Sequence, residues 1–203
     1  LWNNPILNVD LNGAWANPVF GSDGTFRGNT IEGYTGAVII YNGDKDFTKM
    51  SANDLLYNEN FDISTQKGEA NTYDRVRSEL TGDAKSKIWT NIASELEGEQ
   101  IYDEKFSLSS LSNGKISYSS TDPGSWNSRI KSKTITGTDK YSYETTVENI
   151  QSSLVVHEWY SHIQKGNSDE LKSHRLAFKN VINYKDLWDK TTDAYKGFNL
   201  RQL

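Results

Sequence analysis

The sequence predicts an α+β fold in which a small antiparallel β-sheet packs with helices and the C-terminal part forms a helical hairpin. Three observations support this. A short apolar run near residue 40 is typical of a buried strand, the middle of the chain alternates apolar and polar residues, and two later stretches carry apolar residues at helical spacing. All three histidines of the 203 residues lie within the last of these regions.

Aromatic side chains supply much of the expected core. Only 35% of residues are hydrophobic and the mean hydropathy is −0.72, but six Trp, eleven Tyr and seven Phe each bury a large area. The net charge of −5 argues against binding nucleic acid, which needs a basic surface. No apolar run approaches the length of a membrane span. The absence of cysteine excludes disulfides, Cys-ligated zinc and thiol nucleophiles.

The first 36 residues are expected to be loop-rich, because Asn, Gly, Asp and Pro recur throughout them. We interpret residues 1–36 as a junction segment and residues 37–203 as the functional domain. No signal peptide opens the chain. It begins in the middle of a pattern, which suggests a piece of a larger protein.

Residues 37–41 are predicted to form a buried strand, and Ser51 to cap a short helix over residues 51–56. Apolar residues between 72 and 97 recur near helical spacing and are interrupted at Gly82, which predicts two helices. Alternation on both sides of Ser112-Asn113-Gly114 predicts a β-hairpin, with further strands near residues 130, 134–136 and 141–143.

The C-terminal helices have the clearest boundaries. Thr145 and Glu148 have the spacing of a capping box, with Thr145 as the N-cap. Gly166 ends this helix, and Asn167 or Ser168 caps the next one. The apolar face of the second helix consists of Leu171, His174, Phe178 and Val181. A less regular tail, with Trp188 and Tyr195, comes after it.

The string His157-Glu158-Trp159-Tyr160-Ser161-His162 is the strongest functional signal. It is one residue longer than H-E-x-x-H, in which two histidines on one helix face bind zinc and the glutamate is the general base. On a regular α-helix, residues five apart lie roughly 140° apart. Joint ligation therefore predicts a π-bulge between Glu158 and His162, a distortion that favours functional sites.

A third ligand is expected from the return helix. If the two helices fold back on each other, His174 meets His157 and Glu170 meets His162. We favour His174, on the apolar face, and keep Glu170 as the alternative ligand or as a residue that orients a histidine. Three protein ligands would leave one Zn²⁺ position open for water, and Glu158 would take the proton of that water.

Tyr160, Tyr184 and Arg175 are candidates for contacts to a developing oxyanion. Taken singly, packing or a solvated surface position is the more common role for each of these residue types.

Two segments carry a family resemblance. Asn3-Asn4-Pro5-Ile6 and Val9-Asp10-Leu11-Asn12-Gly13, with Leu11 in place of a proline, resemble the end of the core domain in bacterial Rhs-repeat polymorphic toxins. Residues 23–28 and 33–36 are similar to the stretch beyond that core domain in Bacteroidetes members. The segment Ser173–Phe178 resembles a "Ser-His-x-x-Ala-aromatic" string that accompanies H-E-x-x-x-H in such C-termini. H-E-x-x-x-H is also similar to the motif of dipeptidyl peptidase III enzymes, although their second glutamate motif is absent.

The resemblance implies a zincin-like metallopeptidase toxin domain, secreted or delivered into a target cell as part of a larger protein. It again indicates His174 as the third ligand. The implied partners are a protein or peptide substrate, a cognate immunity protein and the parent Rhs shell.

Two alternatives remain open. A metal-dependent nuclease toxin would use a basic groove, for which Arg129, Lys131 and Lys133 are the clearest local cluster. A non-enzymatic module would hold a structural zinc ion with four protein ligands, as when Glu170 joins the three histidines.

Overall fold

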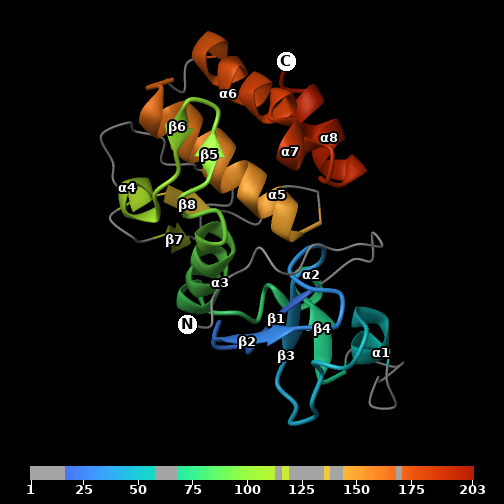
Figure 1. Ribbon diagram of the computed structural model, residues 1–203. Coiled ribbons are helices and arrows are strands. Elements are labelled where there is room, and N and C mark those ends of the chain that lie inside the picture. Colours follow the sequence, from blue (N-terminus) through green and yellow to red (C-terminus); the bar gives the residue numbers. More distant parts are fainter. Residues whose placement is uncertain (1–16, 58–67, 113–115, 119–134, 138–143, 168–170) are drawn as a thin grey trace.

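The computed structural model describes residues 17–57, 68–112, 116–118, 135–137, 144–167 and 171–203 (Figure 1). Helices dominate the second half of the chain and a small sheet lies at the opposite end of the molecule. The predicted α+β class is confirmed. Within the described residues, no helix has the length and apolarity to cross a membrane.

The main sheet has four short strands: β1 (Pro18–Phe20), β2 (Phe26–Asn29), β3 (Ile39–Tyr41) and β4 (Ala70–Thr72). Their order is β2-β1-β3-β4. The strand predicted at residues 37–41 is therefore confirmed as β3. The sheet is mixed instead of purely antiparallel, because β1 and β3 run parallel while the other pairs are antiparallel.

The sheet separates two apolar clusters, because neighbouring strand residues point to opposite faces. Phe20 and Ile40 join the large core beneath the helices. Val19, Ile39 and Tyr41 join a smaller cluster on the other face, which α1 (Ala52–Leu56) covers with Leu55. Ser51 caps α1, as predicted, and it also forms a capping box with Asp54.

Residues 17–36 contain two short strands, β1 and β2, that the expectation of loops did not include, and the rest of this range consists of turns and irregular structure. The turn residues that suggested loops lie in the connection between the strands, where Gly24 has a φ of 81°, and after β2, where Gly33 and Gly36 also have positive φ. Strands of three and four residues are too short to show alternation in the sequence. An aromatic cluster holds this hairpin on the core, with ring centroids 5.4 Å apart for Phe20–Phe26 and 5.8 Å for Phe26–Tyr34. The domain boundary after residue 36 stays a prediction.

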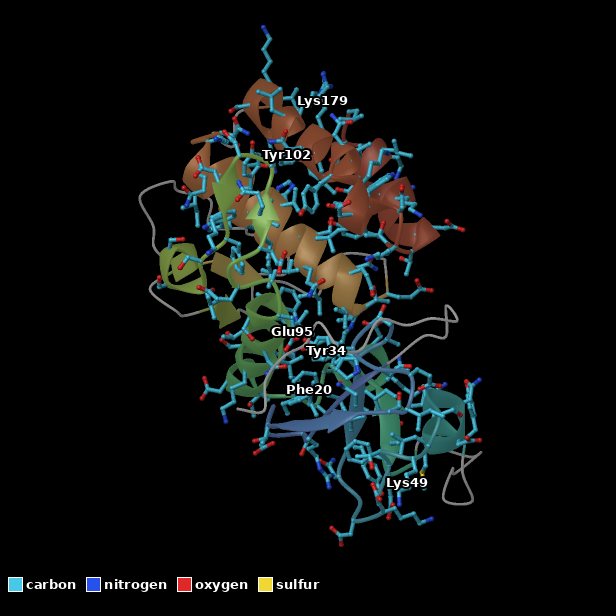
Figure 2. The ribbon with its side chains drawn as sticks, viewed as in Figure 1. Phe20, Tyr34, Lys49, Glu95, Tyr102 and Lys179 are labelled. Atoms are coloured by element: carbon cyan, nitrogen blue, oxygen red, sulfur yellow. The ribbon has the colours of Figure 1, made fainter. Side chains whose placement is uncertain are left out.

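The two helices expected between residues 72 and 97 are α2 (Tyr73–Val76) and α3 (Gly82–Ser94). Gly82 is the first residue of α3, and Thr81 caps it by accepting a hydrogen bond from the Ala84 amide. Figure 2 shows Tyr34 beside α3, where its hydroxyl donates to Asn91 Oδ1 at 2.8 Å.

The middle of the chain differs from its prediction. Strands β5 (Gln100–Ile101) and β6 (Glu104–Lys105) form a small hairpin, and Leu108–Ser112 is helix α4. The hairpin predicted around residue 113 is therefore wrong: β7 (Ile116–Tyr118) pairs in parallel with β8 (Ile135–Gly137). Alternating serines and apolar residues suit one exposed turn of helix as well as a strand, and Trp159 Nε1 fixes α4 by donating to Ser110 Oγ at 2.8 Å. The strands expected near residues 130 and 141–143 lie outside the described residues.

The C-terminal part is helical and consists of α5 (Val147–Gln151), η2 (Ser152–Gln164), α6 (Leu171–Asn183), α7 (Lys185–Trp188) and α8 (Asp193–Leu200). The tail that contains Trp188 and Tyr195 is thus more regular than predicted. Thr192 caps α8, and the buried Tyr195 belongs to the large core.

The N-cap of α5 is Thr146, one residue later than predicted. Both residues of the expected capping box form hydrogen bonds with distant parts of the chain instead. The Thr145 hydroxyl donates to Asp74, and the Glu148 carboxylate accepts from the Gly36 amide at 3.2 Å. Thr146 Oγ1 is left to accept from the Asn149 amide.

Candidate metal centre

His157 and His162 lie on a π-helix, η2, which continues from α5 without a break. In a π-helix the backbone bonds join residues five apart, so a residue and the fifth one after it share a face. The distortion predicted between Glu158 and His162 is therefore confirmed in kind. It is longer than one turn and covers Ser152–Gln164. Two i, i−5 hydrogen bonds mark it near the site: the Lys165 amide donates to the Tyr160 carbonyl at 3.0 Å, and Ser161 Oγ to the Val156 carbonyl at 2.8 Å.

Gly166 ends this helix, as predicted, with a φ of 68° that suits glycine. The chain then returns as α6, which packs along η2 (Figure 1). Phe178 and Val181 of the expected apolar face are buried against it, whereas Leu171 is 69% exposed. This return brings His174 to the two histidines of η2.

The three imidazoles converge on one point. His157 Nε2 lies 3.1 Å from His174 Nε2 and 3.3 Å from His162 Nε2. Candidate ligand atoms of all three residues lie within 4.8 Å of one another. Three nitrogens about 2.0–2.1 Å from a tetrahedral zinc ion would be separated by about 3.3–3.4 Å, the edge of that tetrahedron. The two short distances fit this edge, so the cluster has the dimensions of a metal site and could hold a metal ion.

The surroundings of His157 favour a neutral imidazole that can bind a metal. His157 and His162 are buried, and His174 is partly exposed. Burial, and then the charges that His162 and His174 would carry, hold the pKa of His157 well below its ordinary value of 6.5. A neutral imidazole nitrogen keeps the lone pair that a metal requires.

The ring of His162 is oriented by the turn after its helix. Its Nδ1 lies 2.7 Å from the carbonyl oxygen of Asn167, which can only accept a hydrogen bond. Nδ1 therefore carries the proton, and Nε2 faces the other histidines with its lone pair. Metal-binding histidines in proteins commonly have such a carbonyl partner.

Phe178 forms the apolar wall of the site. Its ring stacks on His174 with centroids 4.9 Å apart, and it lies 4.7 Å from the ring of His157. Phe198 of α8 meets Phe178 edge to face, with ring centroids 6.1 Å apart. The sequence pattern predicts only that Phe178 lies on an apolar face; its position four residues after His174 is the signal that it reaches the same rings.

Glu158 lies against the cluster. Its Oε1 is 3.7 Å from His157 Nε2, and its side chain is 3% exposed. A carboxylate at this distance can accept a proton from a molecule held at the histidines, or approach the metal itself.

The other residues considered for the site lie elsewhere. Glu170, the alternative third ligand, is outside the described residues. Tyr160 and Tyr184 do not reach the histidines: their hydroxyls donate to Asp103 Oδ1 at 2.8 Å and to the Gln100 carbonyl at 3.0 Å. Arg175 is exposed on α6. The basic cluster of residues 129–133 is also outside the described residues.

Family models, curated proteins and solved structures were each compared with the chain, and none matches it. The chemistry of the site is therefore inferred from its own residues and their geometry.

Proposed function

We propose that the chain is a zinc-dependent peptidase in which His157, His162 and His174 hold the metal and Glu158 is the general base. The observation that carries the proposal is the approach of three imidazole nitrogens to 3.1 and 3.3 Å, with a carboxylate oxygen 3.7 Å from one of them. Three ligands and an adjacent carboxylate are the requirements for metal-assisted hydrolysis.

Zinc is the metal that suits this donor set best. Imidazole is a good ligand for zinc, copper, iron and nickel, whereas magnesium and calcium prefer oxygen ligands. The short Nε2 separations match the edge of a small tetrahedron. A bound zinc ion would polarise a peptide carbonyl and make water easier to deprotonate.

The residues of the chain would then divide the work of hydrolysis. Glu158 accepts a proton from the attacking water and returns it to the leaving amine. Its burial excludes bulk water from the carboxylate, and Phe178 keeps the imidazoles in place. The partly exposed edge at His174 is the side from which a peptide would enter.

As its biological setting we propose a toxin domain that is secreted or delivered into a target cell as part of a larger Rhs-type protein. The resemblance of residues 3–13 and 173–178 to such toxins supports this setting. It implies a protein substrate inside the target cell and an immunity protein that protects the producer.

A structural zinc site is the second candidate, and one observation favours it. Glu158 Oε1 lies 3.7 Å from His157 Nε2, so a small rotation of the Glu158 side chain would bring its carboxylate to the metal as a fourth ligand. In that case the coordination sphere would be closed and no position would remain for a substrate.

The experiment that separates these roles is Glu158→Gln, because glutamine keeps the shape of glutamate but cannot take up the proton. We expect it to retain zinc and to lower peptide hydrolysis by about 10²–10⁴-fold, the usual contribution of a general base. Glu148→Gln is the matched control, since both glutamates are 3% exposed and belong to the same continuous helical segment.

Each outcome has a distinct meaning. Loss of hydrolysis in Glu158→Gln but not in Glu148→Gln supports the proposal. Full hydrolysis in Glu158→Gln would show that Glu158 is not the base. If the wild-type protein has no hydrolytic activity and Glu158→Gln loses its zinc, the zinc site has a structural role.

A further inference from the structure

Ser161, the residue before His162, is fully buried and takes part in three hydrogen bonds that lead in different directions. Its hydroxyl donates to the Val156 carbonyl at 2.8 Å and accepts from Asn180 Nδ2 at 3.0 Å. Its carbonyl accepts from the Asn167 amide at 3.0 Å. Each of these bonds ends beside a different part of the metal centre.

The first bond stabilises the wide turn. Val156 and Ser161 directly precede His157 and His162, and both pairs are five residues apart. In a regular α-helix the Ser161 side chain would meet carbonyls three or four residues back. Its bond to a carbonyl five residues back therefore favours the π-helical turn on which the two histidines share a face.

The second bond connects the two helices. Asn180 lies on α6, six residues after His174 and thus on the same rigid element. The amide of Asn180 bonds to the Ser161 hydroxyl, which fixes how far α6 can slide along η2. That position determines the distance from His174 Nε2 to His157 Nε2.

The third bond reaches the ring of His162. The Ser161 carbonyl holds the Asn167 amide, and the Asn167 carbonyl in turn accepts from His162 Nδ1 at 2.7 Å. Ser161 thus supports the group that sets the tautomer and ring orientation of His162.

We propose that Ser161 is the positioning residue of the metal centre: without touching the metal, it holds all three histidines at ligand distance. This inference rests on the proposed metal-binding function. It extends that function by naming the residue that makes the i, i+5 spacing usable. It also explains why a buried polar side chain stands between two ligands.

The β5–β6 hairpin also contacts Asn180. The Tyr102 hydroxyl donates to the backbone carbonyl of Asn180 at 2.6 Å, and Figure 2 shows Tyr102 in the hairpin beside α6. Tyr102 has a φ of 56°, and it alone among the described non-glycine residues has a positive φ. The hairpin thus braces the same residue of α6 that contacts Ser161.

The test compares zinc affinity and coordination geometry in four proteins: wild type, Ser161→Ala, Ser161→Thr and Ser153→Ala. Ser153 is the matched control, because it is a buried serine on the same π-helix whose hydroxyl lies 3.0 Å from Tyr195 Oη. We expect Ser161→Ala to weaken zinc binding by about 10–100-fold, as loss of a group that orients metal ligands commonly does. Ser161→Thr keeps the hydroxyl and should restore most of the affinity.

Cobalt(II) substitution supplies a readout that a general loss of stability would not change. The visible absorption of bound Co²⁺ reports its coordination geometry, so it should differ between wild type and Ser161→Ala and be the same in wild type and Ser153→Ala. Asn180→Ala is a second variant. In the double variant with Ser161→Ala the two losses of zinc affinity should add only in part, because the Ser161–Asn180 hydrogen bond is common to both.

Failure of the inference can be told from failure of the proposed function. If the wild-type protein binds neither zinc nor cobalt, the metal site itself is wrong. If the wild type binds both, and Ser161→Ala matches it in zinc affinity and in the cobalt spectrum, Ser161 has no positioning role. Equal losses in Ser161→Ala and Ser153→Ala would likewise overturn the inference, because any buried hydroxyl would then suffice.

Discussion

Helices α3 and η2 are both 13 residues long, yet they are built in different ways. In α3 a capping residue, Thr81, precedes an amphipathic pattern: Ile88 and Ile92 are buried and Lys87 is exposed. In η2 every residue from Ser152 to His162 is buried, and the capping residue of the continuous helix lies before it, at Thr146 of α5. The first helix obeys local rules, whereas protein surrounds the second on all sides.

The difference shows what a π-helix requires. A wide turn has fewer favourable local contacts than an α-helix, so isolated stretches of it are rare. Burial on all sides, the Ser161–Val156 bond and the contacts of α6 supply what η2 lacks locally. In return, two histidines five residues apart face one site.

The largest expected effect is a loss of zinc affinity at the histidine cluster of η2 and α6. His174→Ala should weaken zinc binding by roughly 3–4 kcal/mol, since four-ligand zinc sites are worth about 10–16 kcal/mol in total. Glu170→Ala should have a much smaller effect, because we expect Glu170 only to orient a ligand. Zinc titration against a competing chelator measures both. If Glu170→Ala lost more affinity than His174→Ala, the third ligand would be Glu170.

A smaller effect is expected on the pH dependence of folding stability, because η2 contains the buried ring of His157 whereas α3 contains no histidine. Burial lowers the pKa of His157 in the folded protein below 6.5, so the unfolded chain binds the proton more readily. The stability of the metal-free protein is therefore complete above pH 6.5 and falls as the pH is lowered toward the folded pKa. The slope contributed by one such group is at most about 1.4 kcal/mol per pH unit.

Urea denaturation between pH 7.5 and 5.5, in the presence of a chelator, measures this slope. The variant His157→Gln cannot titrate at this position and should show a shallower dependence. A wild-type stability that rises as the pH falls would contradict the assignment.

The smallest expected effect is on stability, and it tests whether α3 depends on its own capping residue. Thr81→Ala removes the side chain that caps the Ala84 amide at 3.1 Å and should lower the free energy of unfolding by about 1 kcal/mol. Thr81→Ser keeps the cap and should be close to wild type. Zinc affinity should not change in either variant, because α3 contributes no ligand. A change in zinc affinity comparable to the loss of stability would mean that the two helices are coupled.

Much of the architecture could be predicted from the sequence. The strand at residues 37–41, the Ser51 cap, the paired helices before residue 97 and the turn at Gly166 all arise from periodicity or turn chemistry, which act between near neighbours. The histidine cluster could be predicted for the same reason. Three histidines within 18 residues, divided by a glycine, can meet only if the chain folds back there.

Other features depend on contacts between distant residues. The parallel pairing of β1 with β3 and of β7 with β8 joins residues far apart in the chain, which no local pattern encodes. Thr145 and Glu148 fit a capping box by spacing, but Asp74 and Gly36 offer them better partners in the folded protein.

The histidine cluster depends on both kinds of information. Local sequence sets which residues can bind a metal, because it supplies the histidines and the turn that reverses the chain between them. The Ser161–Asn180 hydrogen bond and the burial of the π-helix depend instead on how α6 packs along η2. Packing sets the distances between the ligands, because a metal site needs atoms placed to within a fraction of an ångström and only neighbouring elements can hold them there.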